Sequence, residues 1–382
     1  MGEQKTMNKK VRRHKAGRIV MGILSAVLIF VLSIGLVGLI IYKSGEMSLK
    51  ASAASEGPQT DIIADKDELE KVKSAYEYES TIPWQDDWIT WNDKIYEYNS
   101  ETINFLLMGI DHSGELDSET DLSDWNAGQA DTIFLLSLNP DTKKISIIGI
   151  PRNSMVQVEV YDSDAQCIDT IYNQICLQYG YAGGGEMGLA KMKDSVSGLF
   201  YELPIHGCCA ISFDAVGIIT DMLGGIEVTV PDDMTAYNSS YTKGSVQKLT
   251  GKNVVPYLRY RDYYTLGSPT VRLTRQKEFI KAAAADLMAA IKENPSIVTD
   301  IYKNVTPYMN TDITLDEAAY LATKVLDYSI GDDSFYQLTG EDKQVDFKTD
   351  SGKDDFYDDY YLDEDSLKQV MIDVFYNEVI VE

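Results

Sequence analysis

The chain has 382 residues, and its 34 lysines and arginines against 60 aspartates and glutamates give a formal net charge of −26. Hydrophobic residues make up 44% of it, which is enough for one large or two small cores and excludes wholesale disorder. Nucleic-acid backbones require a basic surface, so the acidic balance argues against DNA or RNA as a partner. Residues 1–18 differ, because seven cations and one anion give them a net charge of +6.

Residues 19–42 contain no charged side chain and predict a transmembrane helix. A helix of this length crosses a bilayer core of roughly 30 Å. The run is also longer than the roughly 7–15 apolar residues of a cleaved signal peptide. The cations of residues 1–18 place the N-terminus in the cytoplasm by the positive-inside rule. We therefore expect a single-pass protein of the cell membrane, with everything after Lys43 extracellular.

Residues 43–101 are expected to form an extracytoplasmic stem with a helix at 65–79, although their Trp and Tyr side chains could instead pack on the main domain. From 102 to 330 strands alternate with helices. Strands are predicted at 103–110, 131–138, 144–150, 206–213 and 226–230, and helices at 170–180, 186–200, 214–223, 270–293 and 314–328. This order predicts an α/β domain with a mixed central sheet flanked by helices.

Residues 331–382 are acidic and predict a solvated C-terminal extension that ends in an amphipathic helix near 365–377. Calcium binding by this extension is a weaker alternative, because the ligand spacing of an EF-hand loop is absent. The four cysteines are Cys167, Cys176, Cys208 and Cys209. A bridge between Cys167 and Cys176 is allowed outside the cell, and small buried thiols are equally compatible with the sequence.

Arginine is scarce in the part of the chain after the apolar segment. Only five occur there, at Arg152, Arg259, Arg261, Arg272 and Arg275. A guanidinium group binds phosphate or carboxylate bidentately and keeps its charge. Arg272 and Gln276 share a face within the first two turns of the helix predicted at 270–293, where free N–H groups and the helix dipole favour an anion. The set suits a pyrophosphate, and salt bridges on an acidic surface are the alternative.

Two carboxylates are placed at the ends of predicted strands. Asp111 follows the strand at 103–110, and Asp131 begins the strand at 131–138. Strand ends that converge on one edge of a sheet can place two carboxylates around one Mg²⁺, which prefers oxygen ligands and substrate phosphates. The sequence therefore indicates Asp111 and Asp131 as metal ligands and as catalytic candidates.

Several stretches together resemble the LytR-CpsA-Psr family of membrane-anchored phosphotransferases of Gram-positive bacteria. They are INFLLMGID (103–111), ADTIFLLSLNPDTKKISIIGIPRNS (130–154), LTGKNVVPYLRYRD (249–262) and VRLTRQKEFI (271–280). The likeness covers roughly residues 102–295 and follows the chain order of the family. It implies transfer of a glycopolymer, such as teichoic acid or capsular polysaccharide, from undecaprenyl pyrophosphate in the membrane to peptidoglycan.

The resemblance also implies roles for individual residues. Asp111 and Asp131 would hold Mg²⁺ against the pyrophosphate. The residues that would bind its oxygens are Arg152, Arg259, Arg261, Arg272 and Gln276, with Arg275 as a further candidate. The lipid chain would need an apolar groove, for which residues 170–223 are the candidates.

The chain departs from the family pattern at Gln129, where arginine is usual, and at Asn153, where aspartate is usual. These departures favour a second hypothesis, in which the anchored pocket binds a polyprenyl phosphate as a sensor or scaffold of wall assembly without turnover. A third hypothesis is a lipid pyrophosphate hydrolase, with water as the acceptor.

Overall fold

The computed structural model of the protein describes residues 57–58, 66–80, 82–116, 122, 127–260, 267–348 and 354–380. The predicted cytoplasmic segment at 1–18 and the predicted span at 19–42 lie outside these residues. Within the described part of the chain, no helix has both the length and the apolar character needed to cross a bilayer.

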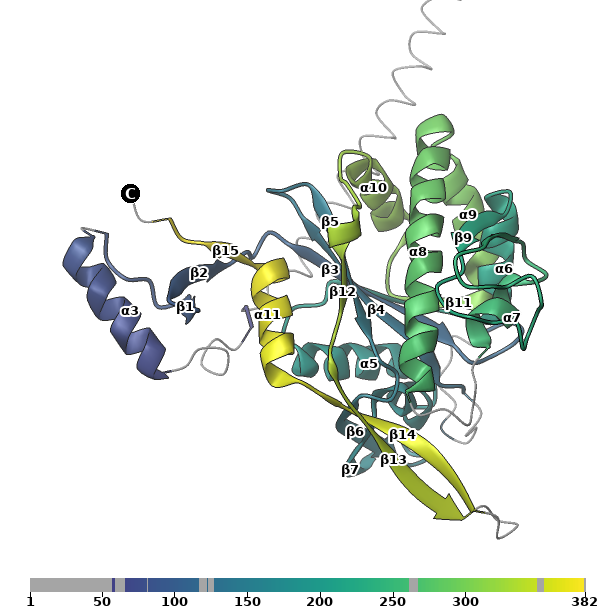
Figure 1. Ribbon diagram of the computed structural model, residues 1–382, viewed down its shortest axis with the longest axis horizontal. Helices are drawn as coiled ribbons and strands as arrows, with labels where there is room; N and C mark the ends of the chain where they lie inside the picture. Colours follow the sequence, from purple (N-terminus) through teal and green to yellow (C-terminus); the bar gives the residue numbers. More distant parts are fainter. Residues whose placement is uncertain are drawn as a thin grey trace, which may run out of the picture.

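A six-stranded mixed sheet forms the centre of the molecule, as the sequence predicts (Figure 1). Its strands, in spatial order, are β11 (Met309–Thr311), β8 (Gly207–Ile211), β3 (Ile103–Ile110), β4 (Ala130–Asn139), β5 (Lys144–Ile150) and β12 (Phe335–Gln337). The strands β3, β4 and β5 form an antiparallel meander. Strand β8 runs parallel to β3, and β12 runs parallel to β5.

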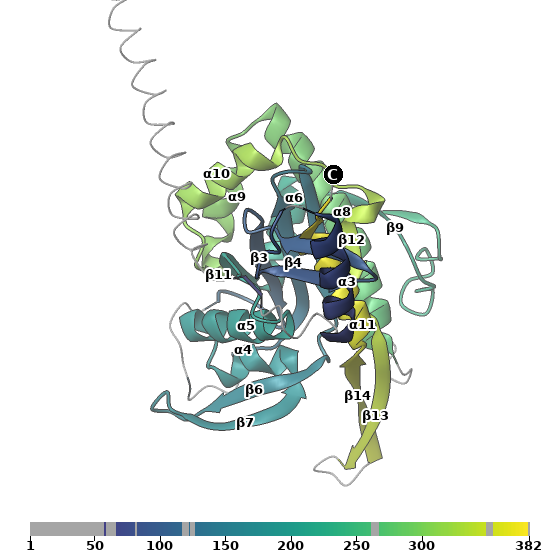
Figure 2. The same cartoon turned by 90° about the vertical axis from the view of Figure 1, so that its left-hand side faces the viewer.

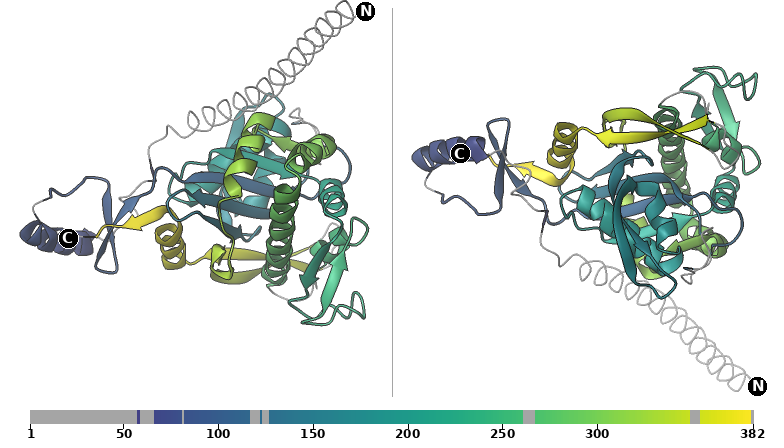
Figure 3. Two further views of the ribbon diagram at one scale, coloured as in Figure 1. Left: turned by 90° about the horizontal axis from the view of Figure 1, so that it is seen from above. Right: turned by 90° about the horizontal axis from the view of Figure 1, so that it is seen from below.

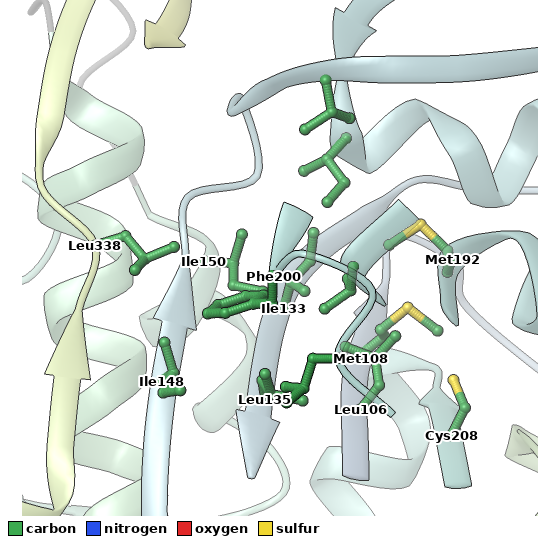
Figure 4. Packing of buried hydrophobic residues seen from close by; sticks show 14 of the residues in the cluster. Leu106, Met108, Ile133, Leu135, Ile148, Ile150, Met192, Phe200, Cys208 and Leu338 are labelled. Carbon is green, nitrogen blue, oxygen red and sulfur yellow. The ribbon is translucent and has the colours of Figure 1, made fainter. Parts of the chain in front are cut away.

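Helices cover both faces of this sheet, which explains why its central strands are apolar on both sides. On one face, α5 (Gly185–Leu199) and α11 (Glu364–Phe375) pack against the even-numbered side chains of β3. Figure 4 shows residues of this cluster from the central strands and from α5. Leu106, Met108, Leu135 and Met192 belong to this cluster. On the other face, α8 (Ser268–Glu293) and α10 (Leu315–Val325) pack against a second cluster.

A smaller subdomain core lies beside α8 and supports one of the site arginines. It contains the hairpin of β9 (Ile226–Thr229) and β10 (Val246–Leu249) with the helices α6 (Phe213–Met222) and α7 (Val254–Arg259). Phe279 of α8 is buried in the same cluster. Because α7 ends at Arg259, the packing of this subdomain fixes where that side chain begins.

The segment predicted as a stem forms a small sheet with the end of the chain. Helix α3 (Lys66–Glu79) precedes β1 (Trp88–Trp91) and β2 (Lys94–Tyr98), and β15 (Tyr376–Glu378) pairs with β2 (Figure 3). Tyr76, Trp84 and Trp88 pack edge to face, with ring centroids 5.4–5.8 Å apart. These three rings form a small cluster of their own with Ile95. Trp91, Tyr96 and Tyr98 instead pack against the main core, as the alternative reading of the sequence allowed.

The C-terminal extension is not the solvated tail that the sequence suggested. Strand β12 joins the central sheet, β13 (Gly340–Lys348) and β14 (Asp354–Leu362) form a long hairpin, and α11 lies in the main core. The buried side chains of α11 are Leu367, Val370, Met371, Ile372, Val374 and Phe375. Burial of this apolar face outweighs the solvation of the acidic residues that precede it.

The helix expected at 170–180 is wrong. Residues 155–174 form a hairpin of β6 (Met155–Tyr161) and β7 (Cys167–Gln174), and the helical part is confined to a 3-10 turn at Ile175–Leu177 and α4 (Gln178–Tyr181). β-branched and aromatic side chains in this stretch favour the extended conformation. Both Cys167 and Cys176 are free thiols, so they are not bridged; Cys176 is buried, as the second reading expects, whereas Cys167 is exposed. The remaining described elements are α9 (Ile297–Val305) and short 3-10 helices at Ile175–Leu177, Thr306–Tyr308 and Asp332–Ser334.

Candidate functional site

The two predicted carboxylates lie at the same end of neighbouring strands. Ile110, the last residue of β3, pairs with Ala130, the first residue of β4. One residue further out, the Asp111 N–H donates to the Gln129 carbonyl at 2.8 Å. Because β3 and β4 are antiparallel, Asp111 leaves the sheet where Asp131 enters it. This is the convergence that the strand order predicted.

Two glycines shape the backbone that leads into β4. Gly128 adopts φ +89°, a left-handed conformation that L side chains rarely accept. The Gly128 carbonyl also lies against Gly180 of α4, where an added Cβ would stand 2.8 Å from the carbonyl oxygen. These small residues let α4 close over the entry to β4 and hold Gln129 and Asp131 beside it.

Asp131 bridges two arginines that are far apart in sequence. Its Oδ1 lies 2.8 Å from Nε of Arg152, and its Oδ2 accepts a hydrogen bond of 3.0 Å from the Arg272 guanidinium. The side chains are largely buried, with 13% of Asp131 and 6% of Arg272 exposed. Both carboxylate oxygens thus meet a guanidinium group in a place with little solvent, where such pairs are strong.

Arg152 lies in the turn that follows β5, and both its backbone and its side chain contact neighbouring residues of the site. Its carbonyl accepts from the Cys176 N–H at 3.1 Å, and its guanidinium contacts the side chains of Gln129 and Cys176. Burial lowers the pKa of Arg152, but Cys176, Asp131 and Asp111 raise it, and the net pKa lies above the ordinary value. The guanidinium therefore stays charged.

Cys176 is a neutral neighbour of this arginine. Burial raises the pKa of the Cys176 thiol to about 11, although the positive charge of Arg152 opposes the shift. At neutral pH the thiol therefore contributes a polarisable contact and no charge. Its role beside Arg152 was not visible in the sequence, because the segment that carries it was expected to be helical.

Arg259 occupies the exposed side of the site. It donates to Oδ1 of Asp111 at 2.9 Å, and its guanidinium lies 4.4 Å from the ring centroid of Phe213. With 47% of its side chain exposed, it is much more accessible than Arg272. An exposed ion pair of this kind contributes roughly 0–1 kcal/mol, so Arg259 can exchange Asp111 for an incoming anion at little cost.

Arg275 does not join this group. Its guanidinium forms two bonds to the Asp232 carboxylate, at 3.0 and 2.9 Å, and two more to the carbonyls of Tyr257 and Tyr260. Only 2% of its side chain is exposed. The structure thus gives Arg275 a positioning role, because it ties the end of α7, which carries Arg259, to α8. Asp232 was not identified from the sequence, because its only local signal is a pair of acidic residues after a predicted strand.

Of three further predicted or divergent positions, two can be placed. Arg261 lies outside the described residues. Gln276 is buried one turn after Arg272 on the same side of α8, as the helical spacing predicted. Asn153 is directed toward the C-terminal hairpin, since its Nδ2 donates to the Asp358 carbonyl at 2.9 Å and its own carbonyl accepts from the Tyr360 N–H. The asparagine that stands here in place of the usual aspartate therefore makes the contact with the β13–β14 hairpin.

The donor set at the strand ends fits the expected magnesium ion. No group of three or more His, Cys, Asp or Glu side chains within the described ranges is arranged to hold a metal. Magnesium sites that also bind substrate phosphates need only one or two carboxylates, and Asp111 with Asp131 supplies two. Arg152, Arg259 and Arg272 give the site three positive charges against these two negative ones, which leaves attraction for a further anion.

Comparison with known proteins places the chain among relatives of the same architecture. The LytR_cpsA_psr family model matches residues 62–370, which include β1, β2 and most of the C-terminal extension. The polyisoprenyl-teichoic acid–peptidoglycan teichoic acid transferase TagU of Bacillus mycoides is 24% identical over 220 residues, which cover 57% of this chain and 64% of TagU. Thus the chain spans less than two thirds of the length of the curated relatives it matches.

Solved structures share the fold. Protein gbs0355 of Streptococcus agalactiae has a TM-score of 0.52 and 24% identity, covering 72% of this chain and 87% of that one. TagV of B. subtilis has a TM-score of 0.50 and 20% identity, covering 72% and 95%. The extent of the family match, together with the sheet order and the carboxylate–arginine cluster at one end of the sheet, shows that the chain belongs to the LytR_cpsA_psr family.

Proposed function

We propose that the chain is a phosphotransferase that moves a phosphate-linked glycopolymer from an undecaprenyl-pyrophosphate carrier to peptidoglycan. The polymer would be of the teichoic acid or capsular polysaccharide type. Residues 19–42 would anchor the protein in the cell membrane with residues 43–382 outside, where both substrates occur. Family membership and the name of the TagU relative support the proposal.

One observation carries the proposal more than any other. Arg152, Arg259 and Arg272 come from three distant segments and meet Asp111 and Asp131 at one end of the sheet. A purely structural ion pair needs one partner for each charge, whereas this cluster holds one more guanidinium than carboxylate. A bound pyrophosphate would neutralise the extra positive charge. It would also accept hydrogen bonds from guanidinium groups that now bind carboxylates.

The residues divide the chemistry according to their positions. Asp111 and Asp131 would hold Mg²⁺, which when bound would neutralise charge on the pyrophosphate oxygens. Arg152 and Arg272 are the buried donors and would orient the pyrophosphate, and Arg259, with Arg261 and Gln276 as further predicted contacts, would bind its exposed oxygens. Charge stabilisation by such fixed donors is the main contribution that a protein makes to phosphoryl transfer.

In the reaction, a peptidoglycan hydroxyl oxygen forms a bond to the phosphorus of the transferred sugar phosphate. The bond from that phosphorus to the bridging oxygen breaks, and the bridging oxygen leaves with undecaprenyl phosphate. Asp111 is the more exposed carboxylate and accepts the hydroxyl proton. Arg152 stabilises the negative charge that develops on the leaving phosphate.

The full-length protein in detergent, incubated with lipid-linked oligosaccharide, peptidoglycan and Mg²⁺, tests the proposal through release of undecaprenyl phosphate. Arg259→Ala and Arg272→Ala should abolish release, while Lys292→Ala removes an exposed cation from the last turn of α8 and should leave it unchanged. Wild-type rates in both arginine variants would refute the proposal. Saturable binding without release would indicate the sensor or scaffold, and release that needs no peptidoglycan would indicate the hydrolase.

A further inference from the structure

The hairpin of β13 and β14 places two carboxylates close to the start of α8 and to the turn that carries Arg152. The register pairs Asp342 with Tyr360, and Asp358 stands two residues before Tyr360 on the same strand. Side chains two residues apart on a strand share a face, so Asp342 and Asp358 lie on one side of the hairpin. Figure 2 shows this hairpin and the β6–β7 hairpin projecting from the same end of the molecule.

That side of the hairpin faces two elements of the candidate site. The Gly267 N–H, at the start of α8, donates to Oδ2 of Asp358 at 3.2 Å. Gly267 also lies against Asp342, whose Oδ2 would stand 3.1 Å from a Cβ added at position 267. From the turn that carries Arg152, the Asn153 amide donates to the Asp358 carbonyl and bonds with the Asp342 carboxylate.

Three oxygen atoms in this place have no hydrogen-bond partner. They are Oδ1 of Asp342, Oδ1 of Asp358 and Oδ1 of Asn153. The Asn153 amide nitrogen contacts both aspartates, and the residue is only 1% exposed, so its orphan oxygen is buried beside them. Buried polar oxygens in folded proteins are almost always satisfied, and an orphan set of this kind commonly marks an ion or water.

The charged side chains of the described residues do not neutralise the two aspartates. Lys343 pairs with Glu341 and lies over the Tyr361 ring on the opposite face of the hairpin, and Lys348 pairs with Asp354. Across the described ranges, no lysine or arginine forms an ion pair with Asp342 or Asp358. The start of α8 offers one N–H and a dipole, which stabilise one carboxylate in part. A second negative charge remains without compensation.

We propose that Asp342, Asp358 and Asn153 bind a divalent cation of the calcium type at the base of the β13–β14 hairpin, apart from the predicted magnesium pair. Two carboxylates, an amide oxygen and added waters form an irregular oxygen set that Ca²⁺ accepts and that the stricter octahedral Mg²⁺ disfavours. The bound ion joins the hairpin to the start of α8 and to the turn of Arg152. The site does not depend on the proposed transfer reaction.

Calcium titration of the full-length protein tests this site. The protein is purified in detergent, stripped with a chelator and titrated with CaCl₂ in magnesium-free buffer by calorimetry, and its Tm is measured with and without Ca²⁺. Wild-type protein should bind one more Ca²⁺ than Asp342→Asn or Asp358→Asn and should gain thermal stability from it. Asn153→Ala keeps both carboxylates and should weaken binding about tenfold or more.

Two controls separate this site from other acidic groups. Asp355→Asn removes an exposed carboxylate from the opposite face of the same strand and should bind like wild type. Asp131→Asn alters the predicted magnesium pair and should keep the hairpin ion. Equal stoichiometry and equal Tm response in wild type and both carboxamide variants would overturn the proposal. If the carboxamide variants do not fold, an unchanged affinity in Asn153→Ala overturns it.

Discussion

Replacing Arg275 by glutamine separates positioning from substrate binding, because this arginine supports the site without facing it. The change removes four hydrogen bonds, two of them to Asp232, and leaves that carboxylate without its counter-charge. Breaking a buried ion pair by removing one partner costs about 3–5 kcal/mol. Asp232 keeps 27% of its side chain exposed, so the lower end of that range applies.

A loss of about 3 kcal/mol corresponds to a fall in Tm of roughly 6–12 °C for a domain of this size. Thermal unfolding of the full-length variant, followed by circular dichroism, measures it. The matched control is Arg259→Gln, which breaks an exposed pair and should change Tm by no more than about 2–4 °C while abolishing release of undecaprenyl phosphate. The double variant Arg275→Gln/Asp232→Asn should recover part of the stability, since it removes the orphan charge.

The reasoning would be refuted by an Arg275→Gln protein that melts with the wild type. It would also be refuted if Arg275→Gln abolished release of undecaprenyl phosphate as fully as Arg259→Gln and left the stability unchanged, because Arg275 would then bind substrate. A positioning role instead predicts a lower Tm, with transfer reduced through the displaced end of α7.

Four further outcomes follow from the structure. Arg272→Lys should slow release of undecaprenyl phosphate roughly 100-fold, because lysine cannot reproduce the planar donor geometry, and an unchanged rate would contradict this. Phe375→Ala should lower the free energy of unfolding in urea by about 3–5 kcal/mol if α11 belongs to the core. At about pH 8, iodoacetamide should modify the exposed Cys167 and spare Cys176, whose pKa burial raises to about 11, and mass spectrometry of the labelled protein decides this. Gln129→Arg should lower the KM for the lipid donor by adding a cation beside the site, and a raised KM would speak against the proposed anion.

The central sheet could be predicted because both faces of its strands are apolar, which leaves a strong local signal at β3, β4 and β5. Strand β7 is mostly exposed, and β14 carries acidic and aromatic residues in adjacent pairs, so neither strand of the β13–β14 hairpin has the alternation of a half-buried strand. Neither carries the hydrophobic period on which sequence reasoning depends. Their conformation is set by pairing with distant partners, which a local pattern does not contain.

The site was predictable as a set of residue types and not as a set of contacts. The scarcity of arginine outside the apolar segment marked Arg152, Arg259 and Arg272 correctly as one group. Arg275 has the same local signal as Arg272, three residues earlier on the same helix. Only the tertiary fold separates them, because it places Asp131 beside one and Asp232 beside the other.

The pairing of β2 with β15 has a consequence for how the molecule is made. An ion pair in this small sheet joins Lys94 to Glu378, which are 284 residues apart in the chain. Contacts of such long sequence separation bear a large loop-closure entropy and form late in folding. A nascent chain therefore has to be synthesised as far as β15 before its first sheet can close. Until then, the free edge of β2 is the surface that a chaperone or another copy would meet.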